Sequence, residues 1–225
     1  MEQRLFNKIY NSIPKNIFVN DDGILSCAID IYLTWCGIRP ACIPFDGEIK
    51  YGGISGNEMT NRMLTTIEGK QCLAKLAKIP KLKVIIGPYY YYATTSIVIY
   101  NSTLNIEPVL AKIKSLHDEI DILKQNKSNK TLIDNTIDQI HVQMGFLLGF
   151  ECPIDIPTLF NQHTKCYDIT YKINTREHLS CSCPFNTKNI INATKRLEII
   201  NDALQKLKQK KINNATLEIN IETLT

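Results

Sequence analysis

The sequence predicts an α+β fold in which antiparallel β-hairpins pack with a helical hairpin and a C-terminal amphipathic helix. Three observations lead to this prediction. Alternation of apolar and polar residues, typical of half-buried strands, recurs along the chain, for example at 167–173. Two apolar stripes at helical spacing follow each other across 106–149, and a third covers 187–207. A chain of 225 residues with 44% hydrophobic content can bury a substantial core, so we expect one compact domain over 1–225, with a sub-boundary near 101–105.

The chain begins with a short helix, because apolar residues recur at helical spacing over 2–13 until a proline ends the pattern. Turn-forming residues at 20–23 then precede the run Leu25–Trp35. Apolar residues at the odd positions of that run predict one face of a strand. A helix capped by Ser26 and ended by Gly37 is the competing interpretation of the same residues.

Glycine and proline are frequent between residues 37 and 56, which predicts a loop. Ser55 and Glu58 have the spacing of a capping box, and apolar residues at helical spacing continue from there to Leu76. The pattern therefore predicts one helix after the loop. The glycines at 52–56 do not form a phosphate-binding loop, because the Lys-Ser/Thr pair of a P-loop is missing.

Two strands are expected at 81–86 and 94–100, joined around Gly87 and Pro88. Four consecutive tyrosines, 89–92, follow this turn. Such rings could stack on bases or sugars, but a hairpin edge with rings on both faces is the interpretation that we favour.

The middle of the chain predicts a helical hairpin at 106–149. Apolar residues keep heptad spacing over 106–123, the polar segment 126–130 interrupts them, and a second stripe follows Thr131. A short connection favours antiparallel neighbours, so the two stripes are expected to face each other or a second copy of the chain. After this hairpin the pattern predicts the strand at 167–173, the helix at 187–207 and a final strand at 217–221.

The densest set of metal-ligating residues lies between positions 163 and 183. Thiolate and imidazole are the ligands that zinc prefers, and this segment holds five of them: His163, Cys166, His178, Cys181 and Cys183. If the strand ending near Asn174 returns antiparallel, residues whose numbers sum to about 350 are opposite each other. Cys166 then faces Cys183 or its neighbour, and His178 is about 16 Å from Cys183 along the strand, too far for a shared ion.

The sequence therefore predicts a zinc site made of His163, Cys166, Cys181 and Cys183. One condition applies, because the last two cysteines stand about 7 Å apart on a flat strand, so the chain must bend at 182–184. The alternative is that these cysteines pack as small hydrophobic residues, since the Cys-x2-Cys pairs of common zinc sites are missing.

Two weaker constellations occur elsewhere. Antiparallel helices at 106–149 would bring two histidines and two aspartates to one height, as in metal sites of helical bundles: His117, Asp121, Asp138 and His141. Cys27 and Cys152 are candidates for a thiol nucleophile, but neither has a partner histidine in a recognisable motif.

The formal charge of +4 and the pI of 8.5 permit a nucleic-acid partner without requiring one, so a protein partner or self-association is favoured. No apolar stretch is long enough to cross a membrane and no secretory signal is visible, which places the chain in the reducing cytoplasm with its eight cysteines as thiols or ligands. The abundance of Ile, Asn and Lys is typical of A/T-rich coding, as in low-GC parasites and large DNA viruses. We expect a non-enzymatic binding or structural module, zinc-stabilised if the site forms; the alternative is a metal- or thiol-dependent enzyme using His and Cys residues.

Overall fold

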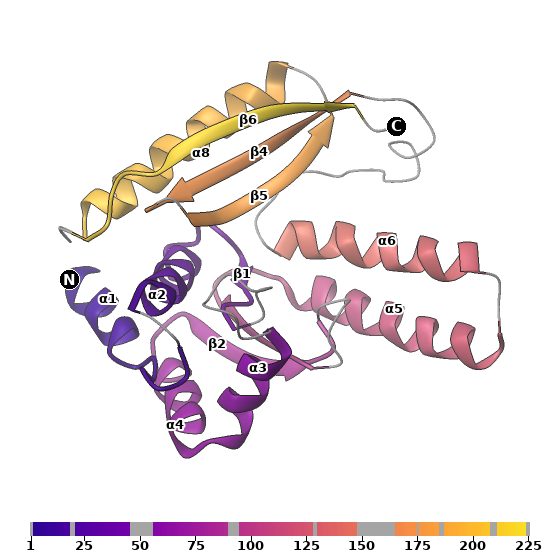
Figure 1. The fold of residues 1–225 in the computed structure, drawn as a ribbon, viewed down its shortest axis with the longest axis horizontal. Helices are drawn as coiled ribbons and strands as arrows, with labels where there is room; N and C mark the ends of the chain where they lie inside the picture. The colour runs from indigo at the N-terminus through magenta and orange to yellow at the C-terminus, as the bar shows by residue number, and fades with distance from the viewer. Residues whose placement is uncertain are drawn as a thin grey trace. The chain divides into compact units, whose positions relative to one another are not determined.

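A computed structural model describes residues 2–18, 21–45, 56–89, 95–127, 130–147, 165–174, 176–184, 187–207 and 211–223. The fold is α+β with antiparallel sheets, which confirms the predicted class. The chain divides into two compact units, residues 1–149 and 150–225 (Figure 1). The division follows the helical hairpin, whereas the sequence suggested a sub-boundary near 101–105. The expectation that the whole chain is one compact domain stays a prediction.

The first unit opens with helices α1 (Glu2–Tyr10) and α2 (Asp21–Trp35), which pack against each other. The prediction of a strand at Leu25–Trp35 is wrong, and the competing helix is present, although it begins at Asp21 and Ser26 lies inside it rather than at its cap. Helix α2 is buried on nearly all sides, so it has no polar face that would reveal its period. Its end agrees with the sequence, because Gly37, two residues after Trp35, adopts a φ of +76°.

The single helix expected through Leu76 is two helices, α3 (Gly56–Thr65) and α4 (Ile67–Leu76). Thr66 separates them, and its side chain accepts a hydrogen bond from the Gly69 amide at 3.1 Å as the N-cap of α4. The two helices pack closely there, since a Cβ added to Gly69 would lie 2.4 Å from the Met63 carbonyl oxygen. Ser55 of the expected capping box lies outside the described residues.

A three-stranded antiparallel sheet forms the centre of this unit. Its strands are β1 (Ala41–Cys42), β2 (Leu82–Gly87) and β3 (Ser96–Asn101), in the order β1-β3-β2. The hairpin predicted around Gly87 is therefore present, although most of the tyrosine run at 89–92 lies outside the described residues. Strand β3 is buried along its whole length, as expected for a central strand.

Helices α5 (Glu107–Gln125) and α6 (Lys130–Leu147) form the predicted antiparallel hairpin (Figure 1). Their facing stripes are buried together with residues from one face of the sheet, and this core cluster includes Val98, Tyr100, Ile113, Ile120, Ile140 and Met144. The opposite face of β3 carries Ile97 and Ile99, both fully buried, and α2 packs there. The sheet is thus covered by helices on both faces. No helix in the described part of the chain is long and apolar enough to span a bilayer.

In the second unit, the described residues form a three-stranded antiparallel sheet and helix α8 (Thr187–Gln205). Strands β4 (Lys165–Ile173), β5 (Arg176–Pro184) and β6 (Thr216–Thr223) are arranged in the order β5-β4-β6. Helix α8 runs along this sheet (Figure 1). The Tyr171 hydroxyl donates a 2.9 Å hydrogen bond to the Ala193 carbonyl, so the face of β4 that carries Tyr171 is the one that α8 covers.

Candidate functional site

Three of the four predicted zinc ligands are in the β4–β5 hairpin, and His163 lies outside the described residues. The predicted register is confirmed, because Cys166 pairs with Pro184, so that the two numbers sum to 350. Asn174 forms the turn with a φ of +51°, a conformation that asparagine tolerates well. His178, which we excluded from the ligand set, is buried at an irregularity of the β5 register.

The same register separates the cysteine positions. Cys181 pairs with Ile169 and Cys183 pairs with Tyr167, which are odd positions of β4, whereas Cys166 is an even position. Positions that pair across antiparallel strands belong to one face of the sheet, and successive positions alternate between faces. The hairpin therefore brings positions 181 and 183 together on one face and assigns position 166 to the other.

Strand pairing also continues through residues 182–184, where the zinc hypothesis requires a bend. Positions 181 and 183 share their face with Ile169 and Tyr171, both buried on the side where α8 packs. A site of His163, Cys166, Cys181 and Cys183 stays a prediction.

The other candidate residues are His117 on helix α5 and the cysteines of the first unit. No group of three or more potential metal ligands comes together among the described residues. His117 of α5 is partly buried, its Nε2 has no hydrogen-bond partner among the described atoms, and desolvation lowers its pKa. Burial raises the pKa of the Cys42 and Cys72 thiols to about 12, so both are protonated at neutral pH and poor nucleophiles. Cys27 is also buried and donates to the Pro44 carbonyl.

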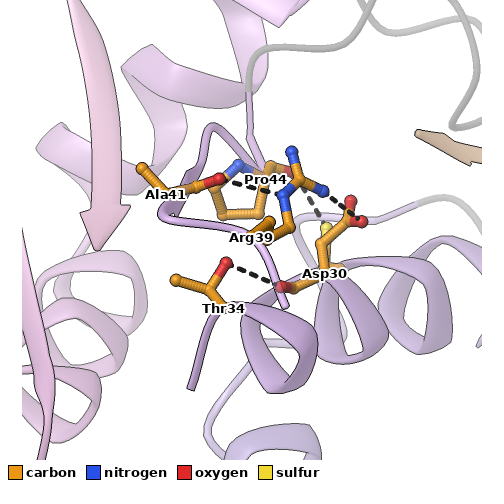
Figure 2. A network of polar contacts seen from close by, with 6 residues as sticks. Asp30, Thr34, Arg39, Ala41 and Pro44 are labelled. Atoms are coloured by element: carbon orange, nitrogen blue, oxygen red, sulfur yellow. Dashed lines mark hydrogen bonds and ion pairs between the residues drawn. The ribbon is translucent and has the colours of Figure 1, made fainter. Parts of the chain in front are cut away.

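A buried polar network closes one edge of the first unit's sheet, at strand β1 (Figure 2). The Arg39 guanidinium forms a 2.8 Å ion pair with Asp30 of α2, and its Nε donates to the Ala41 carbonyl at 2.9 Å. Pro40 accepts a hydrogen bond from the Asn101 amide, so position 40 faces β3 and the backbone groups of Ala41 point away from it. Arg39 therefore satisfies the outward carbonyl of this two-residue edge strand.

Asn101, the last residue of β3, connects that strand to the end of α2. Its side-chain amide donates to the carbonyls of Thr34 and Trp35, both at 3.1 Å. These are among the helix-end carbonyls that have no partner within a helix. Its side-chain oxygen accepts hydrogen bonds from the Thr103 amide and hydroxyl, so the buried Asn101 amide group is well satisfied.

The other edge of this sheet, strand β2, is open among the described residues. The Ser102 amide donates to the Lys81 carbonyl, which fixes the phase of the ladder: positions 81, 83, 85 and 87 face β3, and positions 82, 84 and 86 face outward. The Leu82 amide reaches the Ile79 carbonyl. For Val84 and Ile86, no outward hydrogen bond to another described residue is present.

The side chains of β2 make this edge apolar. Four apolar residues and one lysine occupy positions 82–86, and Ile86 is 52% exposed. The Lys83 ammonium lies 5.8 Å from the centre of the Tyr100 ring and 4.0 Å from a Glu107 oxygen, on its own sheet and helix α5. Charge, proline and bulges are the usual devices that protect a sheet edge. Lys83 is the single charged residue between positions 82 and 87, and its ammonium group lies near Tyr100 and Glu107 of the same chain.

The sequence did not predict which strands form the two edges of this sheet. It identified the strand at 81–86, but not that it would be an edge strand, because strand order depends on residues far apart in the chain. The available signal was an apolar run with a single lysine at position 83.

No family model, curated protein or solved structure matches this chain, so any functional proposal depends on the geometry of the chain itself.

Proposed function

We propose that this protein is a non-enzymatic binding module that takes up an extended protein segment as an additional strand at the β2 edge. The observation that carries the proposal is the difference between the two edges of one sheet. Arg39 covers the outward carbonyl of β1, whereas the outward amides and carbonyls of Val84 and Ile86 have no partner in the described residues. Addition of a strand to an open edge is a common mode of peptide recognition, since main-chain hydrogen bonds supply affinity and side-chain pockets supply specificity.

The chemistry of the first unit supports binding rather than catalysis. The thiols of Cys42 and Cys72 are held protonated by burial, and the ion pair of Arg39 with Asp30 is engaged in a structural role. The exposed Ile86 side chain provides apolar area beside the open backbone groups. A strand that binds there would gain both hydrogen bonds and apolar contact.

Site-specific photocrosslinking tests the proposal. A benzoylphenylalanine at position 86 is expected to form an adduct with a protein, a second copy included, when the full chain is made in cells. The same residue at position 67, a 72% exposed isoleucine on α4, is the matched control and should give no comparable adduct. Val84→Pro, which removes an outward amide while leaving the crosslinker in place, should abolish the product.

Equal crosslinking from positions 86 and 67 would contradict the proposal. So would an adduct at position 86 that survives Val84→Pro, because binding would then not depend on the main chain of β2. Proline at position 84 is compatible with the β2–β3 ladder, since that amide points away from β3. A loss of product can therefore be assigned to the edge once circular dichroism confirms that the variant is folded.

A further inference from the structure

We infer that the strand accepted at this edge is β2 of a second copy of the same chain, so that two three-stranded sheets join into one six-stranded sheet. The inference rests on the proposed function and names its partner. It depends on the self-complementarity of the segment Leu82–Gly87, whose pairing phase is known from the β2–β3 ladder.

Two-fold antiparallel pairing about Ile85 matches the open backbone groups. In that register Val84 of one copy is opposite Ile86 of the other. Both residues point their amides and carbonyls outward, so each such pair can exchange two hydrogen bonds. The two-fold axis generates this pair twice, so that every outward amide and carbonyl of Val84 and Ile86 in both copies takes part in a hydrogen bond. Pairing does not require the Leu82 amide, which is bonded to Ile79, nor Pro88, which has no amide.

The same register avoids repulsion between charges. Lys83, the one charged residue of the strand, is opposite Gly87 of the other copy, so the two lysines do not meet and a residue without a side chain faces each of them. Val84 and Ile86 of both copies would form one apolar patch on the side of the sheet where α2 packs against β3. The exposed fraction of Ile86, 52% in the single chain, is available for that contact.

The other edge strands are less suited to self-pairing. Strand β1 has two residues and its outward carbonyl is bonded to Arg39. Strand β6 carries glutamates at 218 and 222, and β5 begins with Arg176 and Glu177 and ends in a proline. Charges and proline on an edge strand disfavour pairing with another sheet. Strand β2 is thus the edge whose sequence best fits a copy of itself.

Light scattering on the purified full chain tests the inference. The weight-average mass is expected to rise from 25.6 kDa towards twice that value with concentration. Ile86→Pro removes an outward amide and should leave a monomer at every concentration. Ile86→Lys keeps the backbone and inserts a charge into the apolar patch, so it should raise the dissociation constant at least tenfold. Ile67→Lys, the matched change at an exposed isoleucine away from the edge, should dimerise like the wild type.

Amide hydrogen exchange gives the location. Residues 82–87 should become more protected as the wild-type protein is concentrated, and this gain should be lost in Ile86→Lys. A chain that is monomeric at every concentration overturns the inference, and so does a dimer that survives both Ile86 variants. If the purified chain stays monomeric while position 86 crosslinks a different protein in cells, self-pairing fails and the proposed binding function stands. If crosslinking is also absent, both fail.

Discussion

The buried ion pair of Arg39 with Asp30 gives the sharpest prediction about stability. Arg39→Met keeps most of the side-chain volume but removes a 2.8 Å ion pair and the hydrogen bond from Nε to the Ala41 carbonyl. The two side chains are 5% and 13% exposed, so solvent cannot replace the lost partner well. A hydrogen bond to a charged group contributes about 1.5–3 kcal/mol and one to a carbonyl about 0.5–1.5 kcal/mol. Together they predict a loss of about 2–4.5 kcal/mol in the free energy of unfolding, close to the cost of removing one partner of a buried pair.

Urea unfolding followed by tryptophan fluorescence measures this loss in the first unit. The protein has one tryptophan, Trp35, which stacks on Tyr32 and donates its indole N–H to the Pro80 carbonyl, so its emission reports on α2 and its surroundings. Arg62→Met is the matched control. Arg62 pairs with Glu58 on an exposed helix face, with side chains 39% and 49% exposed, and the loss there should stay below about 0.5 kcal/mol.

A double-mutant cycle identifies the source of the loss. If the ion pair is responsible, Arg39→Met should cost much less in an Asp30→Asn background, with a coupling energy of about 1.5 kcal/mol or more. A loss under about 0.5 kcal/mol for Arg39→Met alone, or an undiminished loss in the Asp30→Asn background, would refute the reasoning.

Three further predictions concern other parts of the chain. Gly69→Ala should lower the free energy of unfolding by about 1–3 kcal/mol, since its Cβ would lie 2.4 Å from the Met63 carbonyl oxygen, and an unchanged urea midpoint would contradict this. Desolvation lowers the pKa of His117 in the folded state, so its contribution to stability is complete above the unfolded pKa near 6.5 and falls as the pH drops below that value. Between pH 7 and 5, the free energy of unfolding should therefore decline less in His117→Gln than in the wild type. Parallel curves for the two proteins would count against the prediction. If the predicted zinc site exists, the purified protein should contain one zinc ion per chain, and Cys181→Ser and Cys183→Ser should each remove that ion. Wild-type protein that contains no metal after expression in zinc-supplemented medium would exclude the site.

Local patterns in the sequence predicted several elements well. The stripes at 106–149 have the period of helices packed on one side, and a short polar segment between them leaves antiparallel pairing as the simplest arrangement. The β4–β5 register followed from a turn at Asn174, because a tight turn fixes which residues are opposite each other. In each, the determining interactions lie close together in the chain.

The predictions failed where the structure depends on contacts between residues that are far apart in the chain. Helix α2 was interpreted as a strand because its polar residues gave no helical face: Ser26 and Thr34 are buried, and the Thr34 hydroxyl bonds to the Asp30 carbonyl one turn earlier. The break at Thr66 depends on the close approach of α3 and α4. Arg39 has no local signature either, since its role arises only when Asp30 and Ala41 meet in the fold.

The two edges of the central sheet differ in a way that bears on function. Closing the β1 edge requires a buried arginine, whose desolvation is costly unless it is fully paired, and Asp30 supplies that pairing. The β2 edge could be protected more simply, by a proline or a charge at an outward position such as 84 or 86, yet both positions are apolar. If the open edge were only tolerated, Ile86→Lys would improve solubility and change no association. If the edge is a binding surface, Val84→Pro removes the adduct formed from position 86 and Ile86→Lys weakens the dimer, while Trp35 fluorescence shows an intact first unit in both variants.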